Sequence, residues 1–153
     1  MTYTIKNEPK EGVYRDLIRY AMLCCTQFSL VVRSSIPLDE DGSQFIQTLK
    51  PFLVRTEKTS RWPGTQLIGD FADVSHYQLS SASAELITSV STGLFQWMQP
   101  ELPEDLCLFR TPNEPWLVTI AHERDAYVNL TDDERLALEG RIPQLELQAD
   151  ITR

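Results

Sequence analysis

Residues 105–130 read DLCLFRTPNEPWLVTIAHERDAYVNL, and this stretch decides the predicted fold. It contains three segments of strand composition, at 105–110, 116–122 and 126–130, in which aromatic and branched apolar residues are frequent. The sequences between them, TPNEP and ERD, have the composition of turns. Short strands joined by turns form an antiparallel meander, so we expect a C-terminal β-meander.

Apolar residues at helical spacing predict two helices upstream of the meander. One covers residues 13–25, and the other begins at Ser80 or Ser81 and ends just before Pro100. The second has the clearest apolar face, because its apolar side chains recur every three or four positions. These side chains are Leu86, Ile87, Val90, Leu94, Trp97 and Met98.

Capping signals mark two further helices. Asp41 is the predicted N-cap of one, and Gln44 is placed to reach back to it. Thr131 and Glu134 have the pattern of a capping box at the start of a short final helix. Gly140 is the predicted end of that helix, because glycine is common just after a helix.

Extended patterns predict strands between these helices. Residues 28–33 are rich in β-branched and aromatic side chains, and residues 73–79 alternate so that Val74 and His76 share one face. Residues 53–55 form a shorter extended segment, and residues 61–65 (RWPGT) have turn composition.

The order of these elements predicts the α+β class. We expect a single domain over residues 1–153, with a mostly antiparallel sheet whose C-terminal β-meander packs against about four helices. The end segments, 1–11 and 143–153, are polar and are expected to be loose tails.

The chain is acidic, with 22 acidic and 14 basic side chains and a net charge of −8 over 153 residues. Its densest basic stretch, Arg55, Lys58 and Arg61, is too sparse for a nucleic-acid site, and the remaining charge repels a polyanion. We therefore expect no nucleic-acid partner. A basic protein is the partner that the charge favours.

Cysteine usage and the N-terminus indicate the compartment. Cys24, Cys25 and Cys107 are odd in number and two are adjacent, which makes a poor disulfide framework and favours free thiols in a reducing compartment. The N-terminus lacks the apolar core of a secretory signal, and no apolar run approaches the about 20 residues that span a bilayer. We expect a cytoplasmic protein without a membrane partner.

The common cofactor and nucleophile motifs are absent. The glycines form neither a G-x-G-x-x-G nor a Walker loop, and there is no G-x-S-x-G elbow. His122 and Glu123 are adjacent, but no second histidine stands at zincin spacing. The sequence therefore predicts no cofactor, no metal site and no assigned catalytic residue.

His122 and Glu123 are nevertheless candidate binding residues. If they belong to the predicted strand, adjacent side chains point to opposite faces and one pocket cannot use both. That strand places on one face Trp116, Val118, Ile120 and His122. If the strand ends at Ala121, this objection weakens. His76 is the only other histidine, and it could meet His122 and a nearby carboxylate in the fold.

Aromatic and acidic residues beside prolines supply the other candidates. Segments 62–65, 97–106 and 114–117 each place a tryptophan near proline. Such side chains anchor a partner or line a cleft, or they fix a loop to the core. The candidate binding residues are Trp62, Glu104, Asp105, Trp116, His122 and Glu123. For the adjacent acids Glu104 and Asp105, the alternative is a solvated pair before a strand.

These segments also carry a resemblance. The motifs W-P-G-T, L-P-E-D-L-C and E-P-W-L, within residues 45–139, resemble a small bacterial protein family, some members of which are called stage III sporulation proteins. The resemblance implies a bacterial protein, but it implies no activity and no catalytic residue.

Three functional hypotheses follow. The first is a non-enzymatic binding protein with a toxin-neutralising (immunity) or regulatory role, because an acidic face suits a basic toxin. The second is an enzyme that uses His122 or His76 with nearby carboxylates. The third is a structural module that forms a homodimer through an edge strand or a helix face.

Overall fold

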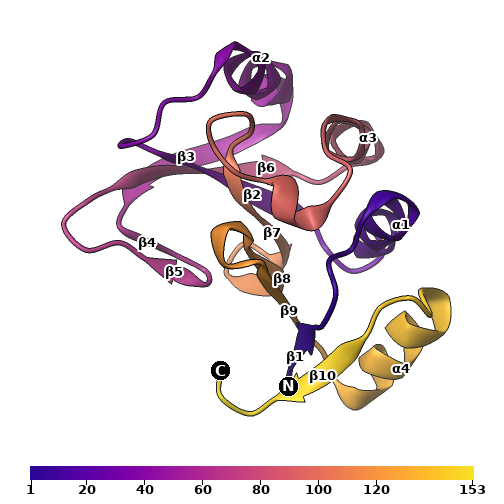
Figure 1. The fold of residues 1–153 in the computed structure, drawn as a ribbon. Coiled ribbons are helices and arrows are strands. Elements are labelled where there is room, and N and C mark those ends of the chain that lie inside the picture. The colour runs from indigo at the N-terminus through magenta and orange to yellow at the C-terminus, as the bar shows by residue number, and fades with distance from the viewer.

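The computed structural model describes residues 1–153, and Figure 1 shows its fold. Eight strands form one antiparallel sheet in the order β10-β1-β9-β8-β7-β2-β6-β3, accompanied by four helices. The predicted α+β class and the C-terminal meander, β7-β8-β9, are confirmed. None of the helices combines the length and the apolar character that crossing a bilayer requires.

The strands of the large sheet are β1 (Thr2–Ile5), β2 (Gln27–Arg33), β3 (Leu53–Thr59), β6 (Ala72–Gln78), β7 (Glu104–Thr111), β8 (Glu114–Ile120), β9 (Asp125–Asn129) and β10 (Leu147–Asp150). A separate hairpin consists of β4 (Arg61–Trp62) and β5 (Thr65–Gln66). The helices are α1 (Glu11–Ala21), α2 (Glu40–Leu49), α3 (Ser81–Val90) and α4 (Asp132–Arg141). Three short 3₁₀ turns are η1 (Lys50–Phe52), η2 (Leu94–Gln96) and η3 (Ala121–Glu123).

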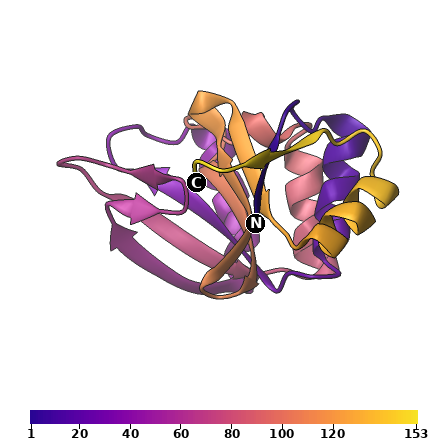
Figure 2. The same cartoon turned by 90° about the horizontal axis from the view of Figure 1, so that it is seen from below.

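The sheet is covered on both faces. Figures 1 and 2 show the helices on one side of it and the β4–β5 hairpin on the other. Strand β2 illustrates the division, because Phe28 and Leu30 belong to the main core beneath the helices, whereas Val31 packs with Trp62 of the hairpin. Because successive side chains of a strand point to opposite faces, the central strands contribute to an apolar layer on each face of the sheet.

Both ends of the chain are strands, so the prediction of loose tails at 1–11 and 143–153 is wrong. β1 pairs with β9 and with β10, and Tyr3 and Ile5 are buried in the main core. The alternation Thr-Tyr-Thr-Ile is a strand signal, but it is only four residues long. It becomes stable through the strands on either side.

α3 ends at Val90, and its predicted continuation toward Pro100 is wrong. Ser91 has an extended backbone, and its hydroxyl donates a hydrogen bond to the carbonyl of Gly93 at 2.7 Å. A serine side chain that bonds the nearby backbone in this way competes with helical hydrogen bonds. The apolar residues that follow remain in the core, because η2 turns them back toward the sheet.

Helix ends differ from the predictions at three positions. α2 begins earlier than expected, because the side chain of Asp39, not Asp41, caps it by accepting from the backbone N–H of Gly42 at 2.8 Å. α1 ends at Ala21 rather than at residue 25. The predicted capping box of α4 is confirmed. Gly140, however, lies inside α4, where its backbone stays helical, so it does not end the helix.

β8 ends at Ile120, and His122 lies in the turn η3 instead of the strand. The β7–β8 register shifts near Trp116, and the consecutive residues Trp116 and Leu117 both belong to the main core. The predicted common face of Trp116 and His122 is therefore wrong. A bulge interrupts the alternation at one end of the strand, and the strand stops before His122 at the other.

The turn of the β4–β5 hairpin gives a test of how closely this hairpin packs on the face of the sheet opposite the helices. Gly64 has φ of 89°, and a Cβ there would lie 2.8 Å from Cγ1 of Ile120 and 2.9 Å from Cγ1 of Val118. We expect Gly64→Ala to destabilise the protein by about 2–5 kcal/mol in urea unfolding, from backbone strain and overpacking together.

Gly69→Ala is the matched control. Gly69 also has a positive φ, 72°, but no atom lies within 4 Å of the added methyl group. Gly69→Ala should therefore lower the free energy of unfolding by only about 1–2 kcal/mol, which is the strain of a left-handed backbone. Equal losses in the two variants would contradict close packing of the hairpin on the sheet.

Candidate functional site

Asp105 connects several of the predicted site residues. Its backbone is left-handed (φ 56°) and it is 2% exposed. Oδ2 accepts a hydrogen bond from Nε1 of Trp62, and Oδ1 accepts one from the backbone N–H of Ala121, each at 3.0 Å. The N–H of Asp105 donates to the carbonyl of Trp97 at 3.2 Å. These four residues, which we call the Asp105 node, join the hairpin, η3 and the segment before β7.

Glu104 lies beside the node and is 5% exposed, with Oε2 lacking a hydrogen-bond partner. Burial raises the pKa of its carboxyl, and the neighbouring Asp105 raises it further, while Arg33 and His122 oppose the shift. Burial also raises the pKa of Asp105, opposed by the two hydrogen bonds to its side chain. Adjacent buried acids with raised pKa occur at active sites and in structural networks alike.

The accessible surface distinguishes these two roles. The structure has five surface hollows, and none is lined by Glu104, Asp105 or His122. A general acid must come within hydrogen-bond reach of its substrate. The acid pair therefore has the surroundings of a structural connection.

The other predicted residues do not join the node by any hydrogen bond. Trp116 lies in the main core, where its ring stacks on Tyr20 at 6.1 Å. Glu123 is exposed, with Oε1 at 3.9 Å from Nε2 of His122. His76 is on β6, which β2 and β7 separate from the β8 strand that leads to His122. That separation is about 14 Å at the usual strand spacing, so the two histidines do not share a site.

His76 is buried beside a small hollow of about 200 Å³, which is also lined by the buried Trp62 and the exposed Arg55. Neither ring nitrogen makes a hydrogen bond, and Nε2 lies 3.7 Å from Oε1 of Glu57. Burial lowers the pKa of His76, Arg55 lowers it further, and Glu57 opposes both. A catalytic base is normally oriented by a hydrogen-bonded third group, which His76 lacks.

The largest hollow lies elsewhere, between the N-terminus of α2, the C-terminus of α3 and the turn η2. We call it the α2–α3 groove. Its volume, about 810 Å³, is in the range of ligand-binding sites. It is lined by Asp41, Gln44, Val90, Phe95, Gln96, Met98, Glu101, Leu102 and Arg124.

Close packing at Gly42 positions one side of the groove. The backbone N–H of Asp39 donates to the carbonyl of Pro100 at 2.8 Å. A Cβ on Gly42 would lie 2.9 Å from the Pro100 carbonyl oxygen and 3.0 Å from that of Glu101. Glycine thus lets the first turn of α2 approach the backbone at residues 100 and 101, which brings Asp41 and Glu101 to the same groove.

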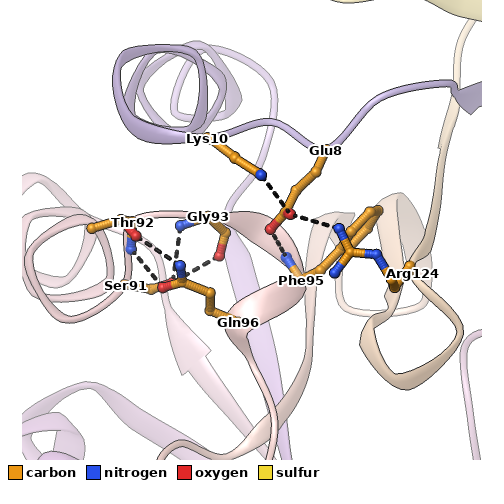
Figure 3. A network of polar contacts seen from close by, with 8 residues as sticks. All are labelled: Glu8, Lys10, Ser91, Thr92, Gly93, Phe95, Gln96 and Arg124. Carbon is orange, nitrogen blue, oxygen red and sulfur yellow. Dashed lines mark hydrogen bonds and ion pairs between the residues drawn. The ribbon is translucent and has the colours of Figure 1, made fainter.

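A polar network holds the opposite wall, as Figure 3 shows. The carboxylate of Glu8 accepts a hydrogen bond from the backbone N–H of Phe95 at 2.9 Å. It also pairs with Arg124 at 3.3 Å and with Lys10 at 3.8 Å. The guanidinium of Arg124 lies over the Phe95 ring, 5.5 Å from its centroid. Glu8 therefore fixes both Phe95 and Arg124 at the groove.

Gln96 fixes the turn that leads into this wall (Figure 3). Its Oε1 accepts from the backbone N–H of Thr92 at 3.1 Å, and its Nε2 donates to Oγ1 of Thr92 at 2.8 Å. Ser91 closes the same turn through its hydrogen bond to Gly93. With these bonds the groove wall is shaped before any partner arrives.

The groove combines apolar and acidic surface. Val90 and Met98 are 38% and 37% exposed and lie together in this groove. Asp41 and Glu101 make no ion pair within the chain. The one cation of the lining, Arg124, is already paired with Glu8. The two free carboxylates therefore dominate the charge that a partner meets.

Sequence reasoning missed this groove but noticed one of its segments. Met98, Glu101 and Leu102 belong to the tryptophan- and proline-marked stretch at 97–106. The remaining lining residues come from α2, α3, η2 and the position after η3, and no sequence pattern connects these elements with one another. Compared with models of known protein families, with curated protein sequences and with solved structures, the chain gives no match.

The raised pKa of Glu104 gives a test of its surroundings. When folding raises a carboxyl pKa, its cost to stability is absent below the ordinary pKa and complete above the folded-state value. Glu104→Gln should therefore gain stability relative to the unmodified chain as pH rises from about 4 to 7. We expect this gain because the amide never has to ionise in its buried position. Urea unfolding across this pH range measures it.

The matched control is Glu146→Gln, at an exposed carboxyl on the loop before β10. It removes the same charge without removing a buried group. A stability difference for Glu104→Gln that does not change with pH, or that equals the control at every pH, would contradict the argument.

Proposed function

We propose that this chain is a non-enzymatic binding protein that holds a basic segment of a protein partner in the α2–α3 groove. The observation that carries the proposal is the combination of exposed apolar side chains with two unpaired carboxylates in one groove. Apolar side chains of the partner would bury against Val90 and Met98. Its lysine or arginine side chains would approach Asp41 and Glu101.

The fixed wall of the groove supports this function. Association loses affinity when loops or side chains must be ordered on binding. Glu8 and Gln96 already hold Phe95 and the turn before it in place. The net charge of −8 adds a long-range attraction that speeds the encounter with a basic partner.

A toxin-neutralising or regulatory role is the biological form of this proposal. Immunity proteins of bacterial toxin systems are similar to this chain in size and acidity. A basic toxin presents the charge that the groove selects, and a carboxylate-lined surface can cover it. A toxin encoded beside this protein is the natural first partner to test.

The enzyme hypothesis has less support from the geometry. Its residues are His122, His76 and nearby carboxylates, but neither histidine hydrogen-bonds to a carboxylate. Glu104 and Asp105 line no hollow that would admit a substrate.

A peptide titration tests the groove directly. The probe is a short peptide of alternating lysine and leucine, added to ¹⁵N-labelled protein. We expect amide shifts confined to the groove, centred on Val90, Phe95 and Met98. Glu101→Lys should weaken binding roughly tenfold or more, because it replaces an attraction with a repulsion.

Two controls accompany this titration. A peptide of alternating glutamate and leucine should give no shifts at the groove. Glu146→Lys makes the same charge change at an exposed site beside β10, outside the groove lining, and should leave affinity within about twofold. The proposal fails if both peptides bind alike, or if Glu146→Lys weakens binding as much as Glu101→Lys.

A further inference from the structure

We propose that β3 pairs with β3 of a second copy of this chain, so that two sheets join into one across a two-fold axis. β3 is the last strand of the sheet and pairs only with β6 (Figure 1). Six of its seven residues are exposed. The outer side of β3 therefore offers unpaired backbone N–H and C=O groups to another strand.

The two edges of the sheet differ in this respect. β10, at the other edge, has only four residues. The chain end beside it is held by Arg153, which pairs with Asp125 and lies 2.8 Å from Asp150. Short strands and charged coverings protect sheet edges from pairing. β3 is longer, and no segment of the chain pairs with its outer side.

Geometry restricts how two β3 strands can pair. In an antiparallel strand, every second residue turns its N–H and C=O toward the free edge. A residue that turns these groups toward the second strand must face a residue that does the same, and in two identical strands these are the same positions. The two-fold axis must therefore pass through a residue, which lies opposite its own copy. Three central positions are available, at Arg55, Thr56 and Glu57.

Charge selects one of these positions. An axis at Arg55 places two guanidinium groups opposite each other, and an axis at Glu57 places two carboxylates opposite each other. Like charges directly opposite are destabilising, whereas opposite charges stabilise a strand pair. An axis at Thr56 places each Arg55 opposite Glu57 of the second copy. This register contains two oppositely charged pairs and no like-charged pair.

The ends of the strand fit the same register. Leu53 and Val54 are 45% and 52% exposed in the single chain. In the pair, Leu53 lies opposite Thr59, and Val54 lies opposite Lys58, whose methylene groups can cover it. The bulge in the β3–β6 register is near Leu53, outside the central charged pairs. β3 also carries two basic side chains and one acidic one, so the acidic charge that would keep two copies apart lies elsewhere.

This interface is separate from the α2–α3 groove. None of the residues that line the groove belongs to β3. The peptide titration and the dimer measurement therefore test different residues.

The test is the mass in solution, measured by sedimentation equilibrium over a range of micromolar concentrations. We expect the unmodified chain to dimerise reversibly. Arg55→Glu and Glu57→Arg each replace two attractive pairs by repulsive ones and should raise the dimer dissociation constant roughly fivefold or more. The double variant, Arg55→Glu with Glu57→Arg, restores opposite charges and should regain dimerisation.

Lys6→Glu is the matched control, because it makes the charge change of Arg55→Glu at an exposed residue far along the sheet from β3. It should leave the dissociation constant within about twofold. Circular dichroism checks that every variant is folded, which the exposure of β3 leads us to expect. A chain that stays monomeric, or single variants that dimerise as well as the unmodified chain, would overturn the proposal. So would a double variant no better than the single ones.

Discussion

The two hydrogen bonds to the Asp105 carboxylate hold together parts of the chain that lie apart in the sequence. They tie the hairpin, through Trp62, and the turn η3, through Ala121, to the start of β7. Burying a carboxylate is costly, and hydrogen bonds to a charged group, worth about 1.5–3 kcal/mol each, offset that cost only when both donors are in place. The hairpin that covers the second face of the sheet is therefore held by these bonds as well as by the packing of Trp62 on Val31 and of Gly64 on Val118 and Ile120.

A sheet covered on both faces leaves its edges, and the margins of its covering layers, as the places where a partner can bind. The α2–α3 groove lies at such a margin, and its wall is fixed by Glu8 from the N-terminal segment. β3 is such an edge. These surfaces favour different partners. The groove combines apolar and acidic side chains, whereas β3 carries Arg55 and Glu57 in an order that lets them pair with the same residues of a second copy.

Some properties of the candidate residues can be predicted from the local sequence, whereas others depend on contacts with residues far away in the chain. Trp62, Glu104 and Asp105 could be selected from the sequence, because a tryptophan beside proline and a pair of acids before a strand are visible locally. Their burial and mutual bonding could not, since Trp62 and Asp105 are 43 positions apart. Trp116 was also selected, but a bulge places it in the main core. The groove was not predicted, because Asp41, Val90 and Arg124 meet only after folding.

The sequence by itself determined the α+β class, the meander, the central strands and the capping box of α4, because hydrophobic periodicity and capping chemistry act over a few residues. Tertiary structure decided the rest. Strand β1 forms because β9 and β10 lie on either side of it, and α3 stops at Val90, where Ser91 bonds the turn that Glu8 helps to hold. These outcomes depend on hydrogen bonds and packing between residues far apart in the chain, which no local pattern records.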